Sequence, residues 1–366
     1  MRVKLEDVCE RGSSNIKQSD IIKMSGNYPI YGASGLAGKV SFYHQEQPYV
    51  AVVKDGAGIG RTTLNPAKSS VIGTMQYLIP KKNVLPEYLF YVVSYMHLEK
   101  YYTGATIPHI YFKDYKNEEF NLDNIEKQLE IIDVLGRCKK VIEARKQELV
   151  ELDSLTKARF VEMFGTLDTP TQAFEKATLK ELCNKITDGK HGGCKSEVGT
   201  ERYFVGAREI YDDDVHYESA PEINIEEFEK DYKRCNVEIG DFLIVNTGAT
   251  IGKSAIACDK RTEHTLLQKS VALLKVKKDV LNPIFLKWCY RVNTKMYMVE
   301  NASAQPNLLL SKINATVIYV PDIELQNQFA DFVHQVDKSK LNKIAARWPA
   351  KAVTQFFFSE NVKLFL

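Results

Sequence analysis

The stretch NTGATIGKS, Asn246–Ser254, has a counterpart near the start of the chain. DFLIVNTGATIGKS, residues 241–254, aligns with YVAVVKDGAGIGRT, residues 49–62, at a constant separation of 192 positions. Each copy runs from an apolar segment into a Gly-Ala turn and then to a basic and a hydroxyl residue. Since glycine adopts positive φ without steric cost, both copies predict a strand followed by a tight turn.

The second copy only imitates a phosphate-binding loop. Gly248 and Gly252 enclose three residues, whereas the loop that curls its N–H groups around phosphates needs four before its Gly-Lys-Ser/Thr. SAIACD, which follows Lys253, reads as a strand and not as a helix that presents its N-terminus to an anion. The turn instead presents a cation and a hydroxyl to a phosphate or a base edge, or it is an ordinary β-turn with solvated charges.

Other matches between the two halves keep the same order along the chain. They are KLEDVCERG (4–12) with TLKELCNKI (178–186), TIPHI (106–110) with AQPNL (304–308), and IEKQLEI (125–131) with IELQNQF (323–329). The separation grows from 174 to 198 positions, so the second half carries longer loops, mostly between Gly189 and Gly240. The chain is therefore predicted to contain one structural unit twice.

Apolar runs bounded by turn residues predict strands in both halves. These runs are YPIYGAS, YVAVVK and VIGTMQYLI in the first half, and RYFVGA, DFLIVN and SVALLKV in the second. A helix follows in each half, over 85–102 and 282–299, with Pro86 and Pro283 near the starts, where a first turn tolerates proline.

A long helix then closes each half. The first is predicted over 124–164, which contains no proline and would span roughly 60 Å. Its apolar residues recur at intervals of seven, with Thr156 completing the series, and the adjacent seam holds Cys138 and Leu152 but also Arg145 and Arg159. The alternative is a helix packed on its own domain. The second helix is predicted from about Glu324, with Phe329, Phe332, Val333 and Val336 on one face.

The composition sets limits on the class of protein. A chain of 366 residues can form two domains with separate cores. Lys+Arg 49 against Asp+Glu 47 gives a net charge of +2, so any basic surface must be local. Seven scattered cysteines without CxxC suggest reduced thiols, and HGGC lacks a second ligand pair for zinc. No signal or membrane-spanning segment is present, so we expect a soluble, cytoplasmic protein.

Catalytic motifs are missing from the sequence. NPIF, residues 282–285, is the nearest match to the Asn/Asp-Pro-Pro-aromatic loop of nucleic-acid methyltransferases, and it reads as a helix cap. GASGLAGK and DGAGIG imitate dinucleotide loops without opening a helix. We therefore expect no catalytic residue and no metal site on this chain.

Basic and planar side chains gather beside the glycine turns and on the TIPHI and AQPNL segments, and such groups contact phosphates and base edges. The candidate phosphate- or base-contacting residues are Lys54, Arg61, Lys68, Ser69, His109, Tyr111 and Lys113 in the first half, and Lys190, His191, Arg208, Lys253, Lys269 and Asn307 in the second.

The ordered pattern resembles a known family. DGKHGG…RYFVGAREI…GDFLIVNTGATIGKSAIA…LQKSVALL…VPDIELQNQF, residues 188–329, is similar to a target-recognition half of the specificity subunit of type I restriction-modification systems. NYPIYGASGLAGKV…KDGAGIGRT…SSVIGTMQYL…TGATIPHIYFKDY, residues 27–115, resembles another variety of that half.

This resemblance implies an α+β fold of two pseudo-repeated target-recognition domains, each followed by a long helix, with the helices forming an antiparallel coiled coil. The implied boundaries are 1–122 and 177–321 for the domains, 123–166 and 322–348 for the helices, 167–176 for a linker, and 349–366 for an atypical tail that contains Pro349. The helix contacts are expected from Leu135, Ile142, Leu149 and Met163 to Phe329, Val333 and Val336.

The resemblance also implies a subunit that performs no chemistry itself. Each half reads one part of a bipartite target in double-stranded DNA, while the helices set the spacing and dock modification subunits. S-adenosylmethionine, ATP and Mg belong to the modification and restriction subunits. Two alternatives are a two-domain scaffold that binds protein or glycan without DNA specificity, and an enzyme that binds nucleotide at the Gly-Ala turns.

Overall fold

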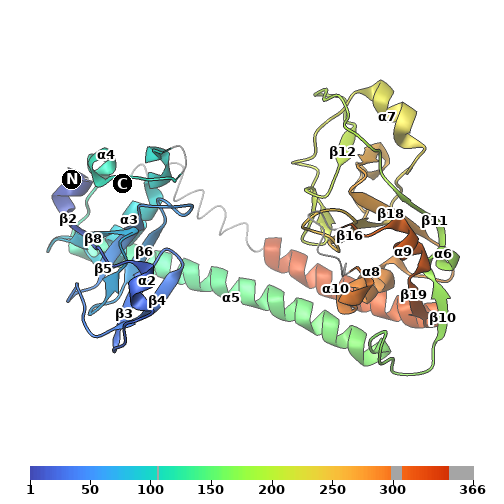
Figure 1. The fold of residues 1–366 in the computed structure, drawn as a ribbon, viewed down its shortest axis with the longest axis horizontal. Coiled ribbons are helices and arrows are strands. Elements are labelled where there is room, and N and C mark those ends of the chain that lie inside the picture. Colours follow the sequence, from blue (N-terminus) through green and yellow to red (C-terminus); the bar gives the residue numbers. More distant parts are fainter. Residues whose placement is uncertain (105–106, 298–306, 346–366) are drawn as a thin grey trace. The chain divides into compact units, whose positions relative to one another are not determined.

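A computed structural model describes residues 1–104, 107–297 and 307–345 (Figure 1). The chain divides into two compact units, residues 1–146 and residues 147–344. The division falls inside one continuous helix, α5 (Ile125–Phe164), so each unit holds part of it. A search of the described helices found none that is both long and apolar enough to cross a membrane.

The first unit is built on a four-stranded antiparallel sheet. Its strands are β1 (Arg2–Lys4), β2 (Cys9–Ser13), β3 (Tyr28–Gly32), β4 (Gly35–Val40), β5 (Tyr49–Val53), β6 (Thr62–Asn65), β7 (Ser70–Val71), β8 (Met75–Pro80) and β9 (Glu119–Asn121). The main sheet has the order β2-β8-β5-β6, and smaller sheets have the orders β4-β3-β7 and β1-β9.

Alternate residues of β5 face two different cores. Val50 and Val52 pack with α3, whereas Tyr49, Ala51 and Val53 pack against the three-stranded sheet. Since successive side chains of a strand point to opposite faces, a strand that is covered on both faces must be apolar throughout, as YVAVV is. The helices of this unit are α1 (Leu5–Val8), α2 (Gln18–Ile21), α3 (Pro86–Tyr95), η1 (Leu98–Tyr101), α4 (Phe112–Tyr115) and the start of α5.

The second unit repeats this plan. Its strands are β10 (Glu175–Thr178), β11 (Cys183–Asp188), β12 (Tyr203–Val205), β13 (Ile210–Tyr211), β14 (Asp214–Val215), β15 (Phe242–Val245), β16 (Ser254–Ile256), β17 (Thr265–Leu267), β18 (Val271–Val276) and β19 (Val317–Val320). Its main sheet, β11-β18-β15-β16, has the same order as β2-β8-β5-β6, and β10 pairs with β19 as β1 pairs with β9. The predicted duplication is thereby confirmed.

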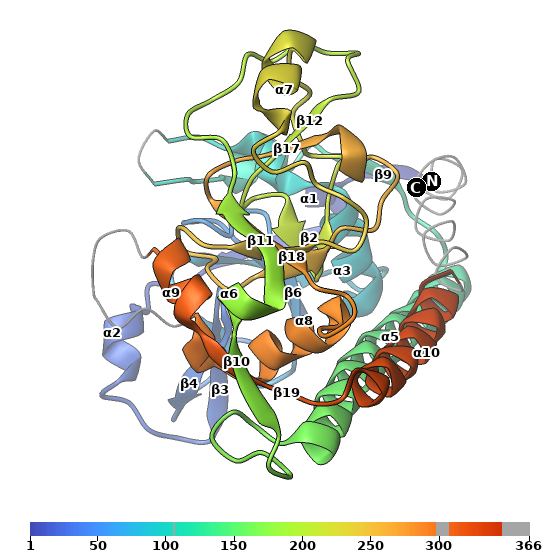
Figure 2. The same cartoon turned by 90° about the vertical axis from the view of Figure 1, so that its right-hand side faces the viewer.

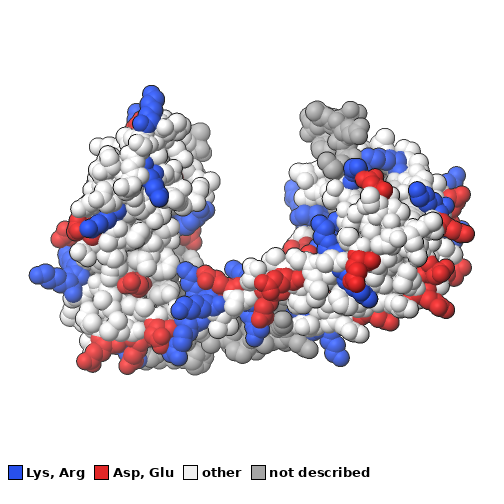
Figure 3. Space-filling view, turned by 90° about the horizontal axis from the view of Figure 1, so that it is seen from below, with Lys and Arg blue, Asp and Glu red and all other residues white. Residues whose placement is uncertain are grey.

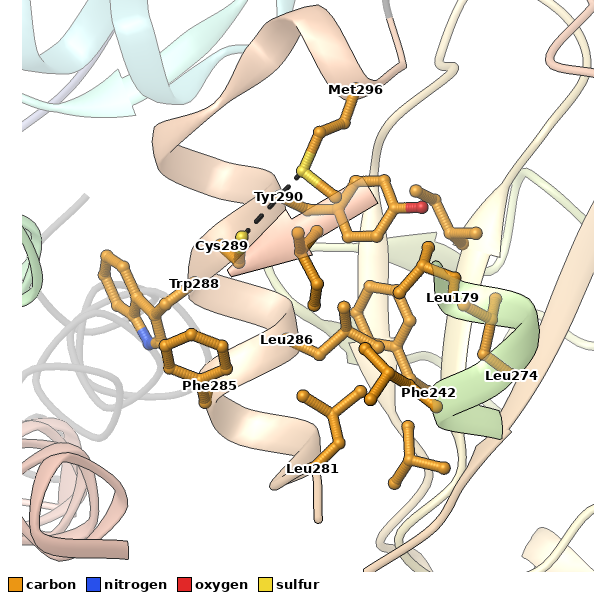
Figure 4. Packing of buried hydrophobic residues seen from close by; sticks show 14 of the residues in the cluster. Leu179, Phe242, Leu274, Leu281, Phe285, Leu286, Trp288, Cys289, Tyr290 and Met296 are labelled. Carbon is orange, nitrogen blue, oxygen red and sulfur yellow. Dashed lines mark hydrogen bonds between the residues drawn. The ribbon is translucent and has the colours of Figure 1, made fainter. Parts of the chain in front are cut away.

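The helices of the second unit follow the same succession. They are α6 (Leu179–Leu182), α7 (Ile225–Tyr232), η2 (Thr262–His264), α8 (Pro283–Val292), η3 (Thr294–Met296), α9 (Leu310–Ala315) and α10 (Ile323–Ala345). The strands β12, β13 and β14 and the helix α7 occupy the longer loops expected between Gly189 and Gly240. Side chains of α8 close the main core: Leu286 points toward Phe242, and Phe285 lies beside Trp288 (Figure 4).

The later part of α5 packs against α10 within the second unit, and the two helices lie side by side in both ribbon views (Figures 1 and 2). Phe160 and Phe164 contact Phe329 with ring centroids 5.3 and 5.7 Å apart. Nearer the start of α5, Asp153 lies 3.7 Å from Lys340, further along α10. Residues nearer the start of α5 therefore contact residues nearer the end of α10, so the two helices are antiparallel.

The helix seam differs in detail from the heptad prediction. Phe329, Val333 and Val336 are buried, and Met163 packs on the cluster that contains Phe329 and Val333. Leu149 is half-buried, as are Leu135 and Ile142 in the part of α5 that belongs to the first unit. The heptad places Arg159 on the adjacent seam, but its neighbour Phe160 is the buried residue. The prediction is therefore wrong by one residue at this position. At this end of α5, the burial of aromatic rings determines which residues face α10, and the interval of seven does not.

Three other local predictions need correction. The helix predicted over 85–102 ends at Tyr95, because His97 adopts a left-handed φ of 50° before η1 begins. VIGTMQYLI forms two strands, β7 and β8, instead of one. The linker implied over 167–176 is shorter than expected: it forms a turn, in which the N–H of Thr171 donates to the carbonyl of Phe164, and β10 already begins at Glu175. The tail with Pro349 lies outside the described residues.

Candidate nucleic-acid interface

The Gly-Ala turns have the same backbone structure in both units. Gly56 and Gly60 have φ of 96° and 79°, and their counterparts Gly248 and Gly252 have 99° and 90°. The N–H of Gly60 donates to the carbonyl of Val53, and the N–H of Gly252 donates to the carbonyl of Val245. Because L-residues rarely adopt such φ values, the repeated glycines are explained by the turn itself.

A second loop contacts each Gly-Ala turn at equivalent positions. In the first unit the N–H of Ile110 donates to the carbonyl of Lys54 at 2.9 Å. In the second unit the N–H of Leu308 donates to the carbonyl of Asn246 at 2.7 Å. A β-bridge joins the neighbouring residues in each case: Asp55 with His109, and Thr247 with Asn307. Each unit therefore builds one surface from two loops that are distant in sequence.

In the first unit three of the predicted contact residues form a small stack beside its turn. The imidazole Nδ1 of His109 lies 2.6 Å from the carboxylate of Asp55. The ring of His109 stacks on Tyr111, and the ammonium of Lys113 lies 5.4 Å from the Tyr111 ring centroid. Tyr111 and Lys113 are exposed, so an aromatic face and a cation are available to a ligand.

In the second unit three of the predicted contact residues line one open pocket of about 220 Å³. Its walls are His191, Lys269 and Asn307 together with Asp188, Asn246 and Thr247. Asp188 is held by Arg234 and also contacts the imidazole Nε2 of His191 at 3.2 Å. The pocket thus combines an ammonium, an imidazole, amides and a hydroxyl, which can all form hydrogen bonds with a base edge or a phosphate.

The remaining cations differ in their freedom to bind a ligand. Lys54 is half-buried, whereas Arg61, Lys68, Arg208 and Lys253 are exposed. Arg61 donates to the carbonyl of Ala33 at 2.9 Å, and Lys68 lies 3.9 Å from Glu46. Within the described part of the chain, Lys253 and Arg208 have no ion-pair partner. Both side chains are therefore available to bind a phosphate group.

Two of the predicted residues are engaged inside the fold. Ser69 is fully buried, and its hydroxyl bonds with Tyr49 and the carbonyl of Pro66. Lys190 lies between Asp231 at 2.7 Å and Glu227 at 3.3 Å, and the bond to Asp231 raises the pKa of the lysine. Both side chains are therefore structural residues here, because their hydrogen-bonding groups already have partners.

The hydroxyls at the turn exits also face the protein. Thr62 donates to the carbonyl of Gly60 at 3.2 Å, and Ser254 is buried. The interpretation that each turn offers both a cation and a hydroxyl is corrected accordingly. The sequence reasoning missed Asp55 and Thr247, although the constant separation of 192 residues already aligned them beside the two glycine turns.

Charges of both signs are interspersed over the face drawn in Figure 3. This agrees with the near-balanced composition, which gives a net charge of only +2. The paired loops recur in both α+β units, so the chain carries the same candidate site twice.

Comparisons with known proteins identify the class. Residues 1–153 and 172–347 match the type I restriction modification DNA specificity domain. The chain belongs to this family of DNA target-recognition subunits, which perform no catalysis by themselves. The match occurs twice, once over each repeat, and nothing in the comparisons supports a protein- or glycan-binding scaffold. A search of curated protein sequences gave no match.

Two solved structures share the fold. The chain is similar to the S subunit of a type I restriction-modification system from M. genitalium, with 14% identity and a TM-score of 0.59, over 98% of this chain and 94% of the other. It is also similar to a chain from a study of complex assembly and conformational transition of the type I R-M system, with 14% identity and a TM-score of 0.54, over 99% and 97%.

Proposed function

We propose that the two units read the two halves of a bipartite target in double-stranded DNA. The observation that carries the proposal is the pair of loops that recurs in both units with different side chains. Asp55 and His109 of the first unit occupy the positions that Thr247 and Asn307 occupy in the second unit. A common backbone with different hydrogen-bonding groups suits two different short sequences, because base edges are distinguished by donor and acceptor pattern.

The long helices fit the role of a spacer between the two recognition units. α5 has 40 residues, so it extends roughly 60 Å. Two recognition units held on such a helix would contact DNA one or two helical turns apart, at about 34–36 Å per turn. Sequence readout would then occur at two sites, and the base pairs between them would go unread.

The partners follow from the family. We infer that α5 and α10 dock modification subunits, which bind S-adenosylmethionine and transfer its methyl group to DNA. Restriction subunits that use ATP and Mg would join the same assembly. The exposed apolar residues Leu129, Val141 and Val150 of α5 give these helices surface to bury against such a partner.

Methylome sequencing tests the proposal. The chain is expressed with its modification subunit in a host that lacks type I systems, and methylated positions are mapped. A bipartite motif with a fixed unread spacer is expected, and it should disappear when this chain is deleted. A continuous motif, or methylation that persists without this chain, would refute the proposal.

A further inference from the structure

The two loop pairs place one side chain of each unit at the same structural position. Position 109 in the first unit corresponds to position 307 in the second, at the separation of 198 that relates the flanking segments. Position 55 corresponds to position 247 in the same way, at a separation of 192. A β-bridge joins 55 with 109 and 247 with 307. In both units, therefore, the residue on the Gly-Ala turn is placed to orient the residue on the second loop.

In the first unit the orienting group is a carboxylate. Asp55 can only accept when ionised, so Nδ1 of His109 carries the hydrogen of their 2.6 Å bond. The backbone of His109 is also held, because its N–H and carbonyl both bond to Thr103. Among the described residues Nε2 has no partner, and the side chain is 35% exposed. The imidazole therefore offers one fixed nitrogen to a ligand.

In the second unit the orienting group is a hydroxyl. Thr247 Oγ1 lies 3.3 Å from the amide oxygens of both Asn307 and Asn246, and its single hydrogen can be donated to either of them. The amide oxygen of Asn307 keeps a free lone pair, and its NH2 group has no partner among the described residues, so the amide can donate to a ligand. Asn307 is exposed and lines the pocket that also contains Lys269 and His191. The second unit therefore offers an amide donor where the first offers an imidazole nitrogen.

A base edge fits these groups better than a phosphate does. Neutral amides such as Asn307 contact phosphates as well as base edges, so the absence of a charge does not decide between them. The planar geometry does, because a planar group beside a second side chain is suited to one donor and acceptor pattern. The NH2 of Asn307 matches an acceptor such as purine N7, guanine O6 or thymine O4, whereas a neutral His109 Nε2 accepts from an amino group of adenine or cytosine.

We propose that His109 and Asn307 are equivalent specificity-determining residues, each reading one base pair in its half of the DNA target. Asp55 and Thr247 are positioning residues that fix the orientation of these readers. The inference rests on the bipartite DNA recognition proposed above, and it assigns one position of each half-site to one residue.

Exchange of the pairs between units tests this directly. In the full chain, assembled with its modification subunit, D55T/H109N gives the first unit the pair of the second, and T247D/N307H does the reverse. Binding is measured on the mapped target and on every single base-pair substitution of both half-sites. The change in preference should fall on one base pair of the matching half-site, by on the order of 5- to 150-fold. The other half-site should keep its preferences.

Two further variants separate reading from positioning. D55N keeps the size of the side chain but removes the charge that orients His109, so discrimination at that base pair should fall while the preferred base stays the same. H97N is the matched control, since His97 is an exposed histidine of the first unit that contacts Glu99 at 3.2 Å and lies outside the two loops joined by the 55–109 bridge. Preferences of H97N should equal those of the unsubstituted chain.

The outcomes are distinct. If the folded variants lose affinity equally for all sequences, positions 109 and 307 contact the DNA backbone. If the base preferences are unchanged, these positions do not contact the target. Either result overturns the inference and leaves the proposed function standing. Loss of all sequence preference by the unsubstituted complex would instead overturn the function. The two exchanges are independent, so a folding failure in one unit leaves the test intact in the other.

Discussion

Gln128 of α5 and Gln326 of α10 are both completely buried, and each makes the same three hydrogen bonds in its own unit. The amide oxygen of Gln128 accepts from the N–H of Leu85, and its NH2 donates to the carbonyls of Asn83 and Asp123. Gln326 bonds in the same way to Asn282, Val280 and Pro321. One polar side chain thus ties the start of α5 to the loop before α3, and another ties the start of α10 to the loop before α8.

Gln326→Leu should destabilise the second unit strongly. The substitution leaves one N–H and two carbonyls buried without their partner, at a cost of about 3 kcal/mol. Urea unfolding of the full chain measures the effect. Gln328→Leu provides the matched control, because Gln328 is exposed on the same helix and its loss should change little. Equal effects of the two substitutions would show that the buried hydrogen bonds do not anchor α10.

The second glycine of each Gly-Ala turn should be the more sensitive one. A Cβ on Gly252 would lie 2.4 Å from the ring of Tyr297, whereas a Cβ on Gly248 would meet nothing within 4 Å. Both have positive φ, so Gly248→Ala should cost about 1–2 kcal/mol from backbone strain alone. Gly252→Ala adds overpacking of about 1–3 kcal/mol.

Thermal unfolding and DNA binding of both variants provide the measurement. Gly252→Ala should lose more stability and more affinity than Gly248→Ala. The first unit gives an independent copy of the test, since a Cβ on Gly60 would lie 2.6 Å from the backbone nitrogen of Glu99 and one on Gly56 would be free. The reverse ranking in either unit would contradict the steric argument.

The repeat and its strands could be predicted from sequence because their causes are local. The apolar runs of β5 and β15 and the glycines at 56, 60, 248 and 252 act through residues close in the chain. Ser69 and Lys190 could not be placed in the same way. The hydroxyl of Ser69 meets Tyr49, and the ammonium of Lys190 meets Asp231, so their burial depends on how distant segments pack.

The helix seam shows the same limit. A heptad places Arg159 beside the partner helix, but packing with Phe285 and Phe329 selects Phe160 instead. The spacing of residues within α5 does not show whether Arg159 or Phe160 contacts the aromatic cluster, because α8 and α10 contribute the other rings of that cluster. The pairing of Asp55 with His109 was missed for a similar reason, because it depends on how the two loops fold together.

Lys253 should contribute to DNA binding through phosphate. The side chain is exposed, and the loss of one phosphate contact lowers the slope of log affinity against log salt by about 0.9. Lys253→Ala should therefore weaken binding to all sequences alike and reduce the slope by that amount, as measured in a salt titration. Lys190→Ala is the control, because Lys190 is already paired with Asp231 and Glu227. An unchanged slope for Lys253→Ala would exclude the contact.

Arg291 should link the body of the second unit to α5. Its guanidinium bonds to Asp213, at the tip of the β13–β14 hairpin, at 2.5 Å and to Asp153 of α5 at 2.7 Å. The partners are partly exposed, so Arg291→Met should cost about 1–2 kcal/mol, less at high salt. Lys295→Met breaks the exposed pair with Asp168 and should leave the unfolding midpoint nearly unchanged. A salt-independent loss at Arg291 would point to its packing on Trp288 instead.

The length of α5 should set the spacing between the two half-sites. An insertion of four residues after Arg145 lies before the segment of α5 whose contacts with α10 are described, so the packing of Phe160 on Phe329 is retained. The insertion adds about one helical turn, roughly 6 Å. At about 3.4 Å per base pair this corresponds to about two base pairs of additional spacer.

Methylome sequencing with the modification subunit measures the result. The bases read at both ends should stay the same, while the unread spacer lengthens by about two base pairs. An insertion of four residues in the loop between α7 and β15, after Asn236, controls for the added length elsewhere, and it should leave the spacer unchanged. Full activity with the original spacer would show that α5 does not set the distance. A changed half-site would show that the helix, and not the loop pairs of the two units, takes part in reading sequence.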